Sequence, residues 1–291
     1  MLVAVVCALG ASLLYALASV LQHRAAVVQP REHSMRLGLL TRLIRKPLWV
    51  VGIICDGLAY LLQFVALGHG SLVLVQPLLV CGLLFALPLG AWLAGTRMER
   101  REWYSALALV AGLSLFLVIA APGNGHAEVS NRAWLLLFVF CGGMAGALVV
   151  AAQCRSDRQR AALLAGAAAA TYGVTAALTK AAAHLFGSGG IPELVTSWEA
   201  YALVGFGLLG MLLAQSAFQA GPLDASLPVL TVVDPVVSIF IGALVLGEGI
   251  ANGLGPTSVE AIGLAIVTIG AFVLSRAEAV QVAHDEPAEM G

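Results

Sequence analysis

Apolar runs of roughly 20 residues recur from one end of this chain to the other, and they constrain its fold more than any other feature. At 1.5 Å per residue, a helix of about 20 residues crosses the ~30 Å hydrocarbon core of a bilayer. Only 11% of the residues are charged, whereas a soluble domain carries about 25%. Most of the exterior must therefore face lipid, and we predict an all-α polytopic membrane protein.

Nine of these runs are predicted to be transmembrane helices, with Gly- and Pro-rich turns between them. They cover residues 2–21, 48–67, 72–94, 103–120, 134–152, 161–186, 200–220, 225–246 and 259–274. The 5 cysteines and 6 histidines are scattered, so we predict no disulfide framework, metal motif or cofactor. The net charge of −1 gives no reason to expect a nucleic-acid partner.

Basic residues predict the orientation of the chain in the membrane. They concentrate in the loops after the first, third and fifth runs, as Arg31, Arg42, Arg100 and Arg158 illustrate. Short loops rich in arginine stay in the cytoplasm. We therefore predict a multi-pass protein of the cell (inner) membrane, with its N-terminus outside and its C-terminus in the cytoplasm.

The two halves of the chain resemble each other. Matching positions keep their order over four consecutive runs; examples are Gly10 with Gly166, Pro77 with Pro228, and Glu102 with Glu260. Five runs separate each element from its copy, so the copies should cross the bilayer in opposite directions. We predict a first repeat over residues 1–120, a linker with the fifth span over 121–160, an inverted repeat over 161–275 and a disordered tail over 276–291.

The segments 217–223 (AFQAGPL) and 227–248 (LPVLTVVDPVVSIFIGALVLGE) carry a family resemblance. A proline-containing helix that closes on Leu-Gly-Glu is similar to the pattern of the drug/metabolite transporter superfamily. Nine spans with an external N-terminus, and Pro47-Leu48-Trp49 opening the second span, further resemble its NIPA-type magnesium-transporter branch. The superfamily resemblance implies alternating-access transport, often proton-coupled, and the branch resemblance implies a divalent cation.

Two carboxylates lie at hydrocarbon depth, where a charge costs at least about 2.5–3.5 kcal/mol. Asp234 precedes Pro235, which cannot donate to the carbonyl of Thr231, and Ser238 shares the same helical face. Asp56 lies near the middle of the second span. We predict that Asp234 is the main proton or cation site with Asp56 as its partner, and that both bind metal only if a divalent cation is the substrate. The alternative is that each aspartate is protonated or hydrogen-bonded and fixes helix packing.

Other binding-site predictions are uncharged polar residues inside or at the ends of spans. They are Tyr15, Tyr60, Gln63, Gln76 and Gln215. Pro77 is the counterpart of the helix break predicted at Pro235. Lys180 and Glu248 are interpreted as residues near helix ends that reach the membrane surface.

These features favour a secondary transporter that moves a small metabolite or drug-like solute and is coupled to protons or another cation. The alternatives are a magnesium or other divalent-cation transporter and a non-transporting accessory subunit of a membrane complex. An enzyme is not predicted, because no nucleophile–base pair is recognisable from spacing. The expected partners are the lipid bilayer and a small-molecule or cation substrate, and a homodimer is compatible with the sequence.

Overall fold

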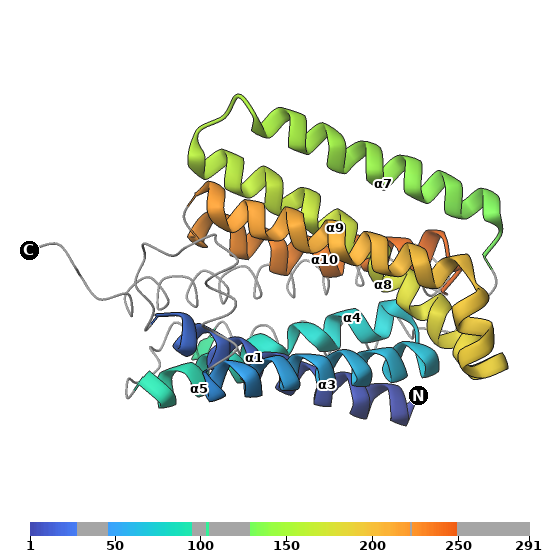
Figure 1. Cartoon of the computed structure of the whole chain (residues 1–291), viewed down its shortest axis with the longest axis horizontal. Helices are drawn as coiled ribbons and strands as arrows, with labels where there is room; N and C mark the ends of the chain where they lie inside the picture. The colour runs from blue at the N-terminus through green and yellow to red at the C-terminus, as the bar shows by residue number, and fades with distance from the viewer. Residues whose placement is uncertain (28–45, 95–102, 105–128, 222, 249–291) are drawn as a thin grey trace, which may run out of the picture.

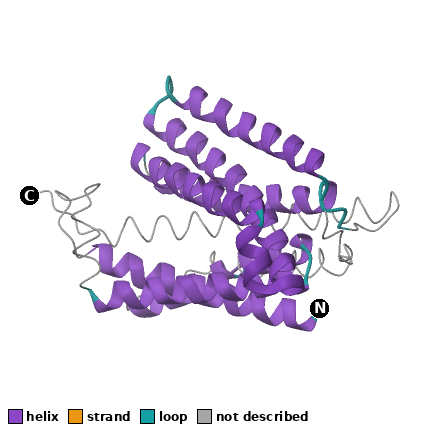
Figure 2. Cartoon of the chain, turned by 45° about the vertical axis from the view of Figure 1, so that its right-hand side comes forward, coloured by secondary structure: helices purple, strands orange, loops and turns teal. Residues whose placement is uncertain are grey.

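The computed structural model describes residues 1–27, 46–94, 103–104, 129–221 and 223–248. Within these ranges every regular element is an α-helix (Figures 1 and 2). The helices are α1 (Leu2–Val27), α3 (Pro47–His69), α4 (Leu72–Val80), α5 (Gly82–Ala94), α7 (Asn131–Ala152), α8 (Asp157–Thr196), α9 (Trp198–Ala220) and α10 (Leu223–Leu244). The predicted spans 103–120 and 259–274 and the predicted tail lie outside the described residues, apart from Trp103 and Tyr104.

Three of the described helices, α3, α7 and α8, are long and apolar enough to cross a membrane. Shorter apolar stretches follow the predicted runs in α1, in α4 and α5, in α9 and in α10. The all-helical prediction is therefore confirmed for the described residues. The number of nine spans and their direction through the bilayer stay predictions.

The third apolar run forms two helices, α4 and α5, instead of one. At Cys81 the backbone tightens: the Cys81 N–H bonds to the Leu78 carbonyl at 3.1 Å, and the Leu84 N–H bonds to the Cys81 carbonyl at 2.9 Å. Pro77 lies inside α4 and does not end it, so the helix break predicted there is wrong in position. Proline withholds a single hydrogen bond from the preceding turn, and the helix absorbs this loss for another turn.

Helix α8 is longer than the predicted sixth span and changes direction at Gly190. This glycine has φ 69°, the left-handed region that glycine adopts without steric cost, and two helical segments meet there. The first segment is rich in buried alanines, such as Ala165, Ala169 and Ala177. Small side chains let neighbouring helices approach closely, and α8 accordingly contacts α3, α4, α7, α9 and α10.

The helices form two groups, which lie one above the other in Figure 1. In the N-terminal group α1 packs along α3, α4 and α5, and in the C-terminal group α8 packs along α7, α9 and α10. The groups meet where α4 contacts α10 and where α3 contacts α8. We call this interface the seam. Its core includes Leu72, Val75, Val174, Leu178 and Ile241, all buried.

One end of the molecule, which we call the α4 end, holds the start of α1, the end of α3 and the start of α4. Gly70, just past α3, lies against Ala4 of α1, and Gly68 lies against Ala183 of α8. Because α1 has only begun at this end while α8 has run most of its first segment, these two helices run in opposite directions.

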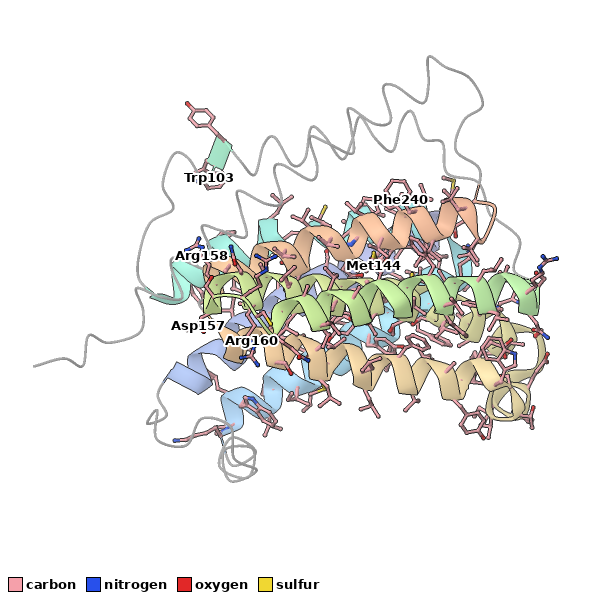
Figure 3. The ribbon with its side chains drawn as sticks, turned by 90° about the horizontal axis from the view of Figure 1, so that it is seen from above. Trp103, Met144, Asp157, Arg158, Arg160 and Phe240 are labelled. Carbon is pink, nitrogen blue, oxygen red and sulfur yellow. The ribbon has the colours of Figure 1, made fainter. Side chains whose placement is uncertain are left out.

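The other end, which we call the α8 end, is where α8 begins and α9 finishes. Gly221, the C-cap of α9, lies against the backbone of Asp157, and Figure 3 shows Asp157, Arg158 and Arg160 gathered there. Helix α3 finishes at the α4 end and α9 at the α8 end, so they also run oppositely. The same holds for α4 and α10, because Leu72 at the start of α4 contacts Glu248 just beyond α10.

Candidate functional site

A cavity of about 780 Å³ lies at the seam and draws its walls from both groups of helices. Helices α1, α3 and α4 contribute from the N-terminal group, and α8, α9 and α10 from the C-terminal group. Polar residues predicted as binding residues occur in its wall: Tyr15, Tyr60, Gln63, Gln76, Thr231 and Asp234. Ligand pockets commonly have volumes of about 300–1,000 Å³, so this one accommodates a small organic molecule.

Asp234 is the acidic residue of the cavity wall. Among the lining residues that the structure describes, it is the one Asp, Glu, Lys, Arg or His. Ser238, one turn further along α10, donates a hydrogen bond to Asp234 Oδ1 at 3.3 Å. Ser238 itself is buried beside the cavity and is not in its wall. Asp234 therefore lines the cavity and accepts a hydrogen bond from Ser238, which lies outside the cavity wall.

Pro235 lies in the cavity wall next to Asp234. Helix α10 continues through it from Leu223 to Leu244, so the helix break predicted at this proline is wrong. One missing N–H does not end a helix whose other turns are packed on a neighbour, and α10 packs along α8. The proline still withholds a helical hydrogen bond from the turn that carries Asp234.

The tyrosines of α1 and α3 are held by hydrogen bonds across helices. The Tyr15 hydroxyl donates to Gln63 Oε1 at 2.8 Å. The Tyr60 and Thr179 hydroxyls lie 3.2 Å apart, and Thr179 already donates to the carbonyl of Thr175 at 2.8 Å. A threonine hydroxyl has a single proton, so Tyr60 is the donor in this pair. This bond joins α3 to α8 across the seam.

Asp56 does not line the cavity, although it shares α3 with Tyr60 and Gln63. It is partly buried and takes part in an interaction of its own. Of the two carboxylates that we predicted to act together, Asp234 lines the cavity and Asp56 does not. The side chain of Gln215, another predicted residue, lies outside the described part of the structure.

Helix α9 supplies an apolar wall that the sequence did not reveal. Its lining residues are Leu203, Val204, Gly207, Leu208 and Met211. Apolar residues that line a cavity have the same composition as residues that face lipid, so sequence alone does not separate them. The cavity is consequently amphipathic, with polar groups on α1, α3, α4, α8 and α10 and an apolar wall on α9.

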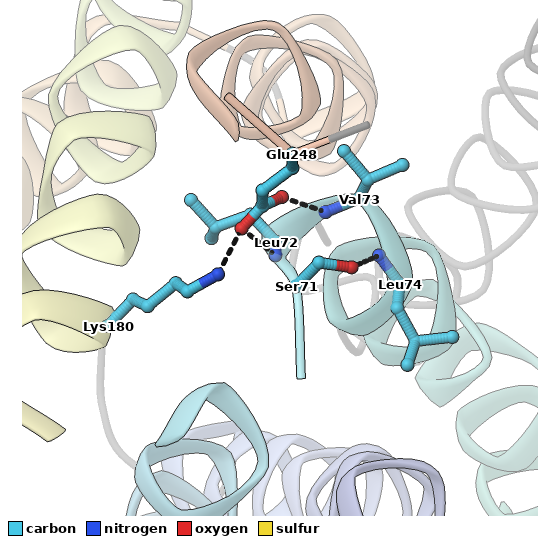
Figure 4. A network of polar contacts seen from close by, with 6 residues as sticks. All are labelled: Ser71, Leu72, Val73, Leu74, Lys180 and Glu248. Carbon is cyan, nitrogen blue, oxygen red and sulfur yellow. Dashed lines mark hydrogen bonds and ion pairs between the residues drawn. The ribbon is translucent and has the colours of Figure 1, made fainter. Parts of the chain in front are cut away.

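A second polar cluster crosses the seam at the α4 end, and the sequence interpretation missed it. Glu248 accepts hydrogen bonds from the backbone N–H groups of Leu72 at 2.8 Å and Val73 at 2.9 Å (Figure 4). Lys180 of α8 forms an ion pair with the same carboxylate. Both residues are buried, with Glu248 1% and Lys180 9% exposed, so the prediction that they reach the membrane surface is wrong. Charged residues inside a span usually pair with an opposite charge or with backbone carbonyls. A lysine in the alanine-rich α8 was therefore the one sign in the sequence that a carboxylate partner exists.

The described residues contain no group of three or more His, Cys, Asp or Glu side chains that could hold a metal ion. In the cavity wall Asp234 is accompanied by hydroxyl and amide groups, and Asp56 is not in that wall. Magnesium favours near-octahedral coordination by carboxylates and waters. The described residues therefore give no structural support to a dedicated divalent-cation site.

A known protein is similar to this chain over almost its whole length. An uncharacterized protein of Corynebacterium glutamicum is 35% identical over 277 residues, which cover 94% of this chain and 95% of that protein. No family model matches the chain, and no solved structure matches it.

Proposed function

The chain belongs to the same family as this Corynebacterium glutamicum protein, and we propose that it is a membrane carrier that moves a small solute by alternating access. The solute binds in the cavity at the seam, and Asp234 carries the proton or cation that couples its movement. The single observation that carries the proposal is a charged, drug-sized cavity between two helix groups. A carrier needs a site that both groups build, because relative movement of the groups then exposes the site to each side in turn.

The opposite directions of the paired helices support this proposal. Helices α1, α3 and α4 pair with α8, α9 and α10 in the predicted repeat, and each pair runs in opposite directions. The packing is also paired, since α1 packs on α3 and on α4 and α5, as α8 packs on α9 and α10. Inverted repeats of this kind hold substrate at their interface in many secondary transporters. This agreement also favours the superfamily resemblance, which stays part of the proposal.

The cavity favours an organic solute over magnesium. A volume of about 780 Å³ compares with about 30 Å³ for a single water in the liquid. An apolar wall on α9 would contribute nothing to a hydrated cation, whereas it suits a solute with an apolar part. An accessory subunit that only packs on a partner has no use for a carboxylate in such a cavity, because holding it there costs free energy.

We propose that the protein crosses the cell membrane several times, with the α8 end in the cytoplasm. The α8 end carries Arg155, Arg158 and Arg160 in and beside the connection from α7. Arginine-rich short connections stay on the cytoplasmic side. The α4 end, with the N-terminus, then faces outward.

Flux measurements on the purified full chain in liposomes test the proposal. Uptake of a panel of amines, amino acids, sugars and divalent cations is recorded with and without a pH gradient. Asp234→Asn keeps the shape of the side chain and an acceptor for Ser238, but it removes the charge. Gradient-driven flux per folded protein should fall at least about tenfold, equivalent to about 1.4 kcal/mol.

Asp157→Asn is the matched control, because Asp157 is exposed at the α8 end and is not in the cavity wall. Its flux should equal that of the wild type. Undiminished gradient-driven flux in Asp234→Asn would refute the role of Asp234. No flux for any member of the panel would count against the carrier itself.

A further inference from the structure

We infer that Lys180 and Glu248 are positioning residues that hold the two helix groups closed at the α4 end, and that the bonds from Glu248 to α4 must open during each transport cycle. This inference rests on the proposed function. It concerns a cluster of residues outside the cavity wall. The role that we assign to this cluster is to keep the seam closed at the α4 end.

The first step is that Glu248 binds one helix group from within the other. Its carboxylate follows α10, whereas the two N–H groups that it accepts from begin α4. These N–H groups are among those that a helix leaves unsatisfied at its N-terminus. The N-cap residue Ser71 satisfies Leu74 at 3.2 Å and leaves Leu72 and Val73 to the glutamate. The N-terminus of α4 is therefore completed by a side chain of the C-terminal group (Figure 4).

The second step is that the carboxylate fits this place closely. A Cβ atom built on Gly242 would lie 2.4 Å from Glu248 Oε2 and 3.0 Å from the Leu72 Cβ. Glycine at 242 thus lets α10 approach the start of α4 until the carboxylate reaches both N–H groups. Lys180 neutralises the charge from the side of α8, so α4, α8 and the end of α10 meet at one point.

The third step concerns the position of the cluster along the seam. Thr179, the residue before Lys180, lines the cavity, whereas Leu72 and Ala183 lie at the α4 end. The cluster therefore stands between the cavity and this end of the molecule. If the groups separate there to admit a solute, the bonds from Glu248 to Leu72 and Val73 must break, because they join the two groups directly.

Amide hydrogen exchange of the full chain in nanodiscs tests this assignment without any solute or pH gradient. The variant Glu248→Gln removes the charge and one acceptor oxygen. Exchange at residues 71–75 and 178–183 should become about tenfold faster, as expected for the loss of one charged hydrogen bond. If the groups rock about the cavity, exchange at residues 157–161 should slow, because the α8 end closes as the α4 end opens.

Slower exchange at the α8 end distinguishes a contact that holds the two helix groups together from a simple helix cap. Loss of a simple cap would change exchange only near residues 71–75. The matched control is Glu193→Gln, since Glu193 is exposed and lies beyond the kink of α8; it should leave every segment unchanged. Faster exchange at residues 71–75 alone, or no change, would overturn the inference.

A second variant covers the case in which Glu248→Gln loosens the whole chain because Lys180 is left without its partner charge. Lys180→Gln combined with Glu248→Gln removes both charges and should restore the pattern of opposite changes at the two ends. Faster exchange throughout the chain in this double variant would show a purely structural pair and overturn the inference. Unaltered flux in Asp234→Asn would refute the coupling role of Asp234 in the carrier and leave this result standing.

Discussion

Replacing Gly242 by alanine tests how closely the end of α10 fits the start of α4. The new methyl group would lie 2.4 Å from Glu248 Oε2 and 3.0 Å from the Leu72 Cβ. The first distance is shorter than Cβ atoms tolerate and the second is unusually tight, so the carboxylate must move. Because Glu248 Oε2 accepts the hydrogen bond from Val73, that bond is the first to be lost.

The magnitude follows from three contributions to the free energy of unfolding. A lost hydrogen bond to a charged group costs about 1.5–3 kcal/mol, and overpacking a tight site costs about 1–3 kcal/mol. Alanine returns up to about 1 kcal/mol through its higher helix propensity. Gly242→Ala should therefore destabilise the protein by about 1.5–6 kcal/mol.

The matched control is Gly142→Ala on α7, where a Cβ atom meets nothing within 4 Å. Helix propensity is then the main term, and the control should be neutral or stabilised by up to about 1 kcal/mol. Unfolding of both variants in mixed micelles, titrated with SDS and followed by circular dichroism and tryptophan fluorescence, measures the difference. Equal stability of the two variants would refute the packing argument.

Two further predictions concern the cavity and the topology. Gly207→Phe should abolish flux without unfolding the protein, because Gly207 lines the cavity. Gly205→Phe should leave flux intact, because Gly205 is exposed, does not line the cavity and has no atom within 4 Å of its Cβ position; blocked flux in both variants would contradict the placement of the cavity. Cys154, the one exposed cysteine among the described residues, lies in the α7–α8 connection. A membrane-impermeant maleimide should label it in inverted vesicles and not in intact cells, and the reverse result would overturn the proposed orientation.

Helix positions were predictable because a bilayer imposes one length and one polarity on a spanning segment. The runs that begin at residues 48, 134, 200 and 225 correspond to α3, α7, α9 and α10, which begin one to three residues earlier. The division at Cys81 was not predictable, because the hydropathy of residues 72–94 has no interruption there. It depends on local hydrogen bonding that replaces the i−4 pattern with an i−3 pattern.

The polar wall of the cavity was largely predictable, and the contacts across the seam were not. Tyr60 and Gln63 were predicted as uncharged polar residues of the second span, and both line the cavity. Glu248 and Lys180 are 68 residues apart in the sequence, and no local pattern indicates which helices meet. Each was interpreted on its own helix, so the ion pair and its bonds to α4 were missed.

The hydrogen bonds of the α8 threonines bear on which solutes the proposed carrier would bind. Thr175 donates its proton to the carbonyl of Thr171, and Thr179 donates to Thr175. Tyr60 and Tyr15 likewise direct their protons to protein acceptors. These hydroxyls therefore offer lone pairs to the cavity, next to the carboxylate of Asp234. On its α8 side the wall therefore accepts hydrogen bonds, whereas the side-chain amides of Gln63 and Gln76 can donate them elsewhere in the wall. A solute of the proposed carrier with donor groups, such as an amine or a polyol, would find its acceptors on α8.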